Sequence, residues 1–273
     1  MILNAERIAI IIPALNEALR IRDVVQGALS HCDNVIVIDD GSDDATCERI
    51  ADLPVTLLRH ARRMGKGASL RDGFREALRC GFDAAITMDG DGQHSADDIP
   101  RLLDAANRHP GAIIIGARMR RRSQQPTYRR LANDFGDWGI AFALGYQVVD
   151  NQSGQRLYPS AVMALDDVPG EDFVFEAQIL ISAAAVLGTR CVSVPIESRY
   201  KSVHSAEQFR ASHFKPVRDF LHITTHITRQ ALGMRSLSAA FHLQRMHPPI
   251  IDDPTGEFGT VFAPSAAQQT RSA

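Results

Sequence analysis

The sequence lacks the cysteine spacing of a disulfide-stapled or zinc-binding protein. No C-x-x-C pair occurs, and the cysteines are scattered along the chain at Cys32, Cys47, Cys80 and Cys191. Disulfide frameworks and zinc knuckles need paired or closely spaced thiols. We therefore expect neither, and we expect a reducing compartment, on the cytoplasmic side of a membrane.

A strong net charge and a long apolar run are also missing. The 273 residues carry 30 Lys and Arg against 32 Asp and Glu, a formal net charge of -2. Nucleic-acid-binding proteins usually present a basic face, so nucleic acid is not expected as a partner. The apolar run at 8–12 is too short for a signal sequence, and no segment reaches the length of a membrane span. Any contact with a membrane would be made from its surface.

Two glycine-rich nucleotide loops are absent as well. No G-x-G-x-x-G follows a strand-like run, which disfavours a dinucleotide-dependent dehydrogenase. The GKG at 65–67 lacks the first glycine spacing and the following Ser or Thr of an NTPase P-loop. A sugar nucleotidylyltransferase usually carries G-x-G-T-R after its first strand, where this chain has PALNE at 13–17.

What the first half does contain is an alternation of short, β-branched apolar runs with amphipathic stretches. The runs predict strands at Ile8–Ile12, Val35–Ile38, Thr56–Leu58, Ala84–Met88 and Ile113–Ile115. Apolar residues at helical spacing predict helices at Ala18–Ser30, Asp44–Ala51, Ala68–Cys80 and Asp97–Asn107. This alternation is typical of βαβ units. We predict an α/β fold with an open, mostly parallel sheet flanked by helices.

Beyond Arg118 the pattern changes to a basic stretch followed by helices and a turn-rich segment. The predicted elements are helices at Tyr128–Leu144, Phe175–Leu187 and Phe214–Leu243, turns at Asp150–Pro159 and a strand at Cys191–Ile196. Residues His247–Ala273 are rich in Pro, Gly, Ser and Gln and predict a loose tail. We divide the chain into one domain, 1–235, with C-terminal helices, and a flexible extension, 236–273.

Acidic side chains are concentrated directly after two predicted strands. Asp39 and Asp40 follow the second strand, and Asp89 and Asp91 follow the fourth in MDGDGQH. Ligands of an open parallel sheet bind at the carboxyl ends of its strands. Two carboxylates one residue apart can turn toward one hard cation such as Mg2+ or Mn2+, and Gln93 offers a further oxygen. The competing interpretation is a turn with helix-capping acids, because Asp and Gly are common turn residues.

In their order and spacing, four segments resemble family 2 glycosyltransferases with the GT-A fold, especially the branch of dolichyl-phosphate mannose and glucose synthases. They are PALNE at 13–17, VIDDGSDDAT at 37–46, GKG at 65–67 and MDGDGQH at 88–94. Later segments look like blocks of the same family: GAR at 116–118, DNQSGQRLYP at 150–159, FVFEAQIL at 173–180 and VPIESRY at 194–200. One departure is HARRMGKG at 60–67, where many members have Asn in place of the two arginines.

The resemblance implies a nucleotide-diphosphate sugar as donor and Mg2+ or Mn2+ as cofactor. It places Pro13, Ala14, Glu17, Asp39 and Asp40 at the nucleoside. It makes Asp89, Asp91 and Gln93 the metal ligands, with Gly90 and Lys66 beside the nucleotide sugar. The candidates for neutralising charge on the departing diphosphate are Arg118, Arg199 and Lys201.

Glu176 is the candidate for a general base. It lies in FVFEAQIL at the start of a predicted helix, where apolar neighbours are expected to raise its pKa by desolvation. A hydroxyl acceptor needs a carboxylate to take its proton, with Glu171 or Asp172 as substitutes for Glu176. A lipid phosphate is already anionic at neutral pH and needs no base; Glu176 would then orient the acceptor or Arg199. The catalytic candidates are therefore Asp91, Glu176 and Arg118.

The predicted function is inverting sugar transfer to an acceptor that is lipid-linked, such as a polyprenyl phosphate. Two alternatives stay open: transfer to a hydroxyl of a soluble or glycan acceptor, and a catalytically silent nucleotide-sugar-binding protein. The basic run 120–122 predicts peripheral contact with anionic lipid, although such a run is often only a solvated face.

Overall fold

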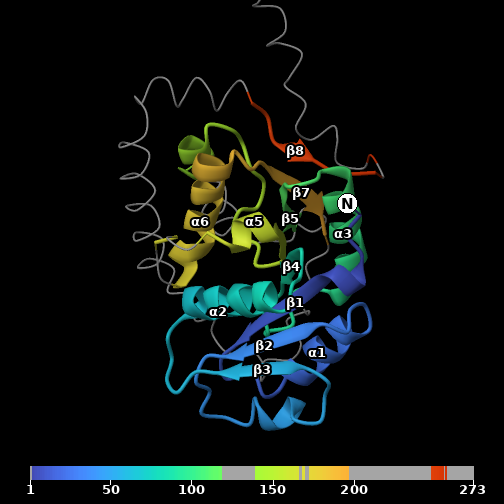
Figure 1. The fold of residues 1–273 in the computed structure, drawn as a ribbon, viewed down its shortest axis with the longest axis vertical. Helices are drawn as coiled ribbons and strands as arrows, with labels where there is room; N and C mark the ends of the chain where they lie inside the picture. The colour runs from blue at the N-terminus through green and yellow to red at the C-terminus, as the bar shows by residue number, and fades with distance from the viewer. Residues whose placement is uncertain are drawn as a thin grey trace, which may run out of the picture.

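The computed structural model describes residues 2–118, 139–165, 168–169, 172–196, 247–254 and 256. They form an eight-stranded sheet in the order β3-β2-β1-β4-β6-β5-β7-β8 (Figure 1). The strands are β1 Ile8–Ala14, β2 Val35–Asp39, β3 Thr56–Arg59, β4 Ala84–Thr87, β5 Ile113–Ala117, β6 Arg156–Pro159, β7 Cys191–Pro195 and β8 Ile250–Ile251. Strand β6 is antiparallel to both neighbours, and every other pairing is parallel. The predicted α/β fold with an open, mostly parallel sheet is confirmed.

Helices cover both faces of the sheet. They are α1 Ile21–Leu29, α2 Lys66–Arg79, α3 Ile99–Arg108, α5 Ser160–Met163 and α6 Asp172–Ser182, which continues into a π-helical turn at Ala183–Leu187. Short 3-10 turns lie at Ala5–Arg7, Glu48–Ile50 and Ala96–Asp98. Figure 1 shows α2, α5 and α6 on one side of the strands and α1 and α3 on the other.

Successive residues of the central strands supply two separate cores, because side chains alternate between the faces of a strand. In β1, Ile11 packs into the core under α2 and α6, while Ile10 and Ile12 pack into the core under α1 and α3. Since both faces are buried, these strands read as continuous apolar runs rather than alternating ones. This is why the strands of the first half were predicted at their observed positions.

One predicted helix of the first half is wrong. Only Glu48–Ile50 of the expected Asp44–Ala51 helix is helical, as a 3-10 turn. The preceding residues instead bind the loop that follows β1: Thr46 Oγ1 accepts a hydrogen bond from Glu17 N at 2.9 Å, and Asp44 accepts one from Ala18 N at 3.2 Å. These side chain to backbone bonds compete with helix formation.

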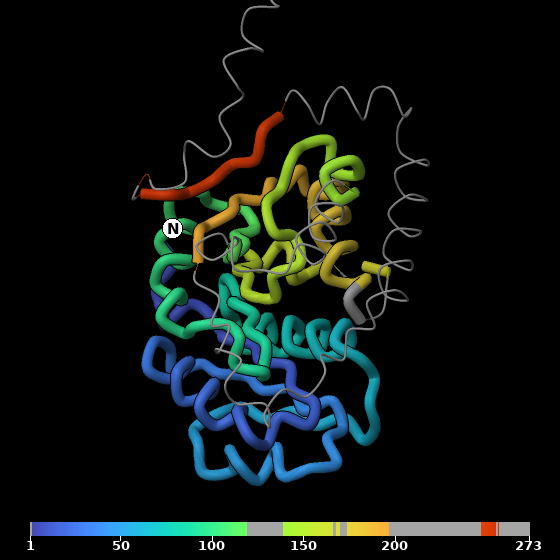
Figure 2. Tube along the Cα trace, turned by 180° about the vertical axis from the view of Figure 1, so that it is seen from behind, coloured from blue at the N-terminus to red at the C-terminus, as the bar shows by residue number. Residues whose placement is uncertain are grey.

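Two strands were missed in the second half. The segment predicted as turns, Asp150–Pro159, ends in β6, and the predicted loose tail contains β8, which pairs with β7. Asp252, just after β8, accepts a two-pronged ion pair from Arg108 of α3 at 2.8 and 2.9 Å. The loose-tail prediction is therefore wrong for this segment, whose red trace follows the sheet edge in Figure 2.

Other predictions for the second half fall partly outside the described residues. The strand at 191–196 is confirmed as β7, and residues 139–144 of the helix predicted at 128–144 are helical. The helix predicted at 214–243 and the domain boundary at 235 lie outside the described part, so both stay predictions. Within the part of the chain that is described, no helix has the length and apolarity needed to cross a membrane.

Helix α2 lies unusually close to the sheet because it carries a glycine at the contact. A Cβ atom at Gly73 would lie 2.6 Å from Ile11 Cγ2 and 3.0 Å from Ile38 Cδ1, both of which belong to buried side chains. Such distances are too short for carbon atoms, so any larger residue has to push the helix away. The glycine thus fixes how closely the first residue of α2, Lys66, approaches the sheet.

We expect Gly73→Ala to destabilise the protein by about 1–3 kcal/mol, as other overpacked cores are destabilised, despite the better helix propensity of Ala. The matched control is Gly27→Ala in α1, where the new Cβ would lie 3.2 Å from Ala96 Cβ. The helix-propensity gain of about 1 kcal/mol should offset the cost of this milder contact. Urea unfolding with an unchanged m-value measures both. Equal stability of the two variants would contradict the close-packing interpretation.

Candidate active site

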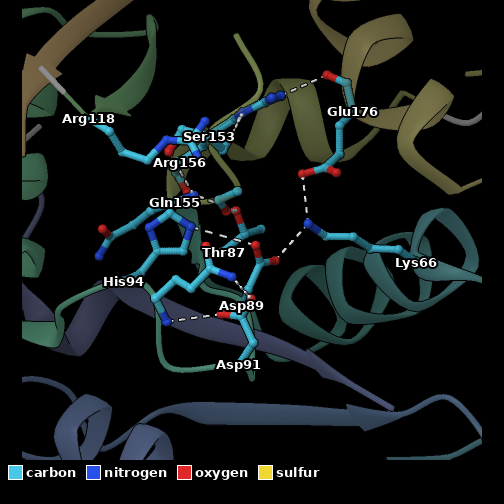
Figure 3. A network of polar contacts seen from close by, with 12 residues as sticks. Lys66, Thr87, Asp89, Asp91, His94, Arg118, Ser153, Gln155, Arg156 and Glu176 are labelled. Atoms are coloured by element: carbon cyan, nitrogen blue, oxygen red, sulfur yellow. Dashed lines mark hydrogen bonds and ion pairs between the residues drawn. The ribbon is translucent and has the colours of Figure 1, made fainter. Parts of the chain in front are cut away.

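One lysine joins three elements at the carboxyl end of β4. Lys66 Nζ lies 2.6 Å from Asp89 Oδ1 and 3.1 Å from Glu176 Oε1. Lys66 begins α2, Asp89 follows β4, and Glu176 belongs to α6 (Figure 3). Their side chains are 18%, 27% and 9% exposed, respectively. The structure therefore brings three predicted site residues into one largely buried ion-pair network.

The charges of this network shift each other's pKa values. Burial alone would raise the pKa of Asp89, but the Lys66 ammonium and His94 outweigh burial and hold that pKa well below its ordinary value. Burial would likewise lower the pKa of Lys66, and the two carboxylates instead raise it above its ordinary value. Both groups are therefore charged at neutral pH.

Asp91 is in a different position. Burial first, and then the negative charge of Asp89, raise the pKa of Asp91 above its ordinary value. Asp91 accepts hydrogen bonds from Gln93, with Oδ1 3.0 Å from the backbone N and Oδ2 2.8 Å from Nε2. Gln93 thus turns its amide NH2 toward Asp91. The same repulsion reaches Glu17, whose pKa is raised by burial and by Asp91.

These residues fit a divalent metal held jointly by protein and ligand. In the described part of the chain, no three side chains of His, Cys, Asp or Glu form a metal-binding group. Mg2+ is commonly bound by one or two carboxylates together with substrate phosphates and waters, so a closed protein cage is not required. The mutual repulsion of Asp89 and Asp91, visible in the raised pKa of Asp91, is what such a cation relieves.

The floor beneath Asp89 is formed by β6 and the loop before it. A Cβ atom at Gly154 would lie 2.8 Å from Asp89 Cγ, so only glycine leaves room for this carboxylate. Thr87 Oγ1 donates to Gly154 O at 2.7 Å and holds the two segments together. The turn-forming residues at 150–155 hid the strand that follows, although a glycine two positions before RLYP was a usable signal of close backbone packing.

Arg156 is the second group that sequence reasoning missed. The residue is 1% exposed, and its guanidinium donates to the backbone oxygens of Asn151, Ser153 and Glu176, the last two at 2.7 Å. It thereby ties the loop before β6 to helix α6 directly behind the Glu176 carboxylate (Figure 3). A buried arginine with carbonyl partners leaves no local pattern in a sequence.

Two buried polar atoms border the ion-pair network without a hydrogen-bond partner among the described residues: His94 Nδ1 and Gln155 Oε1. His94 presents its other nitrogen, Nε2, to Asp89 Oδ2 at 3.6 Å. Buried polar atoms normally have partners, so these two mark a place where a ligand or water completes the site.

The residues predicted at the nucleoside lie together at the ends of β1 and β2. A Cβ atom at Gly90 would lie 3.3 Å from Pro13 O and 3.5 Å from Ala14 Cβ, which puts the MDGDG loop directly against the PALNE loop. Glu17, farther along PALNE, pairs with Arg20 at 3.2 Å.

Asp39 and Asp40, at the end of β2, are both engaged by the protein. Asp39 is fully buried and pairs with Arg59 Nε at 3.1 Å. Asp40 is 4% exposed and accepts hydrogen bonds from the backbone N atoms of Met64 and Gly65, each at 2.8 Å. The second acidic pair therefore holds neighbouring loops in place.

Arg118 is held by a two-pronged ion pair. Its Nε and NH2 lie 2.7 and 2.6 Å from the Asp150 carboxylate, and its backbone N donates to the same group at 2.8 Å. Arg118 lowers the pKa of Asp150 against the opposing effect of burial. Arg199, Lys201, residues 120–122 and Glu171 lie outside the described residues, and the same holds for the side chain of Asp172.

Comparisons with known proteins identify the family of the chain. The model of the family described as "Glycosyl transferase family 2" matches residues 9–164. An undecaprenyl-phosphate mannosyltransferase of Micrococcus luteus is 31% identical over 208 residues, covering 70% of this chain and 82% of that protein. A UDP-N-acetylglucosamine--dolichyl-phosphate N-acetylglucosaminyltransferase of Methanococcus voltae is 31% identical over 178 residues, 57% of this chain and 70% of that protein.

A solved structure shares the fold. Glucosyl-3-phosphoglycerate synthase from Mycobacterium tuberculosis, solved with Mn2+, UDP-glucose and phosphoglyceric acid, superimposes with a TM-score of 0.58 at 20% identity. The alignment covers 91% of this chain and 81% of that one, which confirms the predicted GT-A-type fold. With the family model spanning more than half of the sequence, the chain belongs to glycosyl transferase family 2.

Proposed function

We propose that this glycosyltransferase moves a sugar from a nucleotide-diphosphate donor to a polyprenyl-phosphate acceptor, with inversion at the anomeric carbon and with Mg2+ or Mn2+ as cofactor. The observation that carries the proposal is the meeting of Asp89, Lys66 and Glu176 at the carboxyl end of β4, where ligands of open α/β sheets bind. The names of the two relatives, both lipid-phosphate sugar transferases, support the acceptor class.

Each residue has a separate task in this proposal. Asp89 and Asp91 hold the divalent cation, with Gln93 beside them. That cation, when bound, neutralises charge that develops on the departing nucleoside diphosphate. Lys66, Arg118, Arg199 and Lys201 are proposed to assist in this task. The PALNE loop and Asp39 are proposed to bind the nucleoside.

A phosphate acceptor suits the environment of Glu176. Its carboxylate faces the Lys66 ammonium at 3.1 Å, a partner that the sequence did not indicate. A carboxylate that is engaged by a cation is better suited to orienting groups than to taking a proton. Because a phosphate monoester is already anionic at neutral pH, the reaction needs no base. We therefore propose that Glu176 positions Lys66 rather than accepting a proton.

Membrane contact is the remaining part of the proposal. A polyprenyl chain is embedded in lipid, so the site has to work at a bilayer surface. The basic run 120–122 is proposed to supply attraction to anionic lipid, at about 1 kcal/mol per residue near the surface. We propose that the protein acts at the cytoplasmic face of the membrane.

We expect Asp91→Asn to lower sugar transfer by at least roughly 10²-fold, because several kcal/mol of metal-mediated charge stabilisation are lost. Nucleoside diphosphate release from a panel of UDP and GDP sugars, titrated with Mn2+, measures this loss. The thermal unfolding midpoint should not fall, because burial and Asp89 already make ionised Asp91 unfavourable. Asp52→Asn, which removes an exposed carboxylate paired with Arg22, is the control and should keep full activity. Near wild-type turnover of Asp91→Asn at saturating metal would refute the assignment.

We expect Glu176→Gln to lower kcat by less than about tenfold with a polyprenyl-phosphate acceptor, with the acid limb of the pH profile unchanged, because a phosphate acceptor needs no base. Gln keeps an oxygen that can accept a hydrogen bond from Lys66. A loss of roughly 10²- to 10⁴-fold would instead identify Glu176 as a base and favour a hydroxyl acceptor. The measurement is kcat against pH with matched phosphate and hydroxyl acceptors.

A further inference from the structure

The segment that departs from the family pattern, HARRMGKG at 60–67, contains a histidine that the proposed chemistry does not use. His60 lies just after β3, and its side chain is 9% exposed. It sits between two carboxylates from different elements: Nδ1 is 2.7 Å from Asp40 Oδ1, and Nε2 is 3.0 Å from Asp72 Oδ2. Asp40 follows β2, and Asp72 belongs to α2.

This arrangement defines the protonation state of the ring. Ionised carboxylates only accept hydrogen bonds, and a neutral imidazole has one N–H donor. Two carboxylate contacts at hydrogen-bond distance therefore require both ring nitrogens to donate, which only the imidazolium does. Burial alone lowers the pKa of His60, but the hydrogen bonds and charges of Asp40 and Asp72 outweigh burial and raise that pKa above its ordinary value.

Asp40 connects this ring to the active site. The same carboxylate accepts hydrogen bonds from the backbone N atoms of Met64 and Gly65. Gly65 has φ +93°, a conformation that L side chains rarely adopt, and it caps α2 immediately before Lys66. The series of contacts from His60 through Asp40 to Gly65 thus determines where α2 begins and where Lys66 lies.

We propose that His60 is a positioning residue: as an imidazolium clamped between Asp40 and Asp72, it holds segment 64–66 so that Lys66 meets Asp89 and Glu176. The effect on catalysis rests on the proposed function, whereas the clamp itself does not. Loss of the His60 proton removes one donor, leaves one carboxylate unpaired and loosens the start of α2.

The direction of the pH dependence follows from the raised pKa. The clamp is fully present below the unfolded-state pKa of histidine, about 6.5, and is lost as pH rises through the higher folded-state pKa. The other charges at this place are Arg75, which pairs with the second oxygen of Asp72 at 2.5 Å, and Arg59, which pairs with Asp39 at 3.1 Å. Arginine is not deprotonated in proteins, so His60 is the group that titrates here.

The test is an NMR titration of the ligand-free protein. We expect the His60 imidazole to titrate above pH 6.5, and the backbone amides of Met64 and Gly65 to shift with the same midpoint. Asp72→Asn should move that midpoint to lower pH, because one of two stabilising carboxylates is gone. The control is Glu76→Gln, which removes another carboxylate of the same helix. Glu76 pairs with Arg79, whereas the pKa of His60 is raised by Asp40 and Asp72, so this variant should leave the midpoint unchanged.

Activity gives the second arm. With a donor that supports turnover, the KM for the donor should rise roughly tenfold as His60 deprotonates, which corresponds to the loss of one charge-assisted hydrogen bond. Asp72→Asn should shift this rise to lower pH. His60→Gln should have the raised KM at all pH values. A His60 midpoint at or below 6.5, or Met64 and Gly65 amides that do not follow it, overturns the clamp. If the His60, Met64 and Gly65 signals titrate as expected but no sugar transfer is detected, only the proposed function is overturned.

Discussion

The site depends on pairing largely buried carboxylates with a cation. Asp89 and Glu176 come from β4 and α6, and a single ammonium, that of Lys66, faces both. An uncompensated charge in such surroundings costs several kcal/mol, so the position of α2 is tied to the position of the two acids. For Asp91 the compensation is incomplete: burial and Asp89 raise its pKa, although Lys66 acts in the opposite direction. The site thus contains two carboxylates paired by Lys66, namely Asp89 and Glu176, and a third, Asp91, that gains from a further cation.

Two glycines allow this ion pair to form. Gly73 lets α2 lie against Ile11 and Ile38, and Gly154 lets the loop before β6 pass directly beneath Asp89. A methyl group at either position would separate groups that now interact at less than 3.2 Å. The charged groups therefore meet only because these two glycines let the backbone segments that carry them pack closely.

Sequence reasoning succeeded where burial leaves a continuous apolar run. The apolar runs of β1, β2 and β4 identified the sheet, and because ligands bind at strand carboxyl ends, Asp39 and Asp89 followed from the strand positions. It failed where the deciding contacts are distant in sequence. Lys66 and Glu176 lie 110 positions apart in the sequence, and Arg156 acts through backbone carbonyl groups, which every residue has. Strand β8, with two residues, is too short for any pattern.

The short strand β8 has a consequence for the behaviour of the protein in a crowded solution. Strand β7 is buried in all five residues, and an uncovered apolar edge is a template for pairing with another chain. β8 occupies that edge with only two residues and is followed by Asp252, whose ion pair with Arg108 keeps it in place. At the opposite edge, β3 carries the charged side chain of Arg59. In the described sheet, one border therefore ends in a short covering segment, and the other carries the partly exposed Arg59.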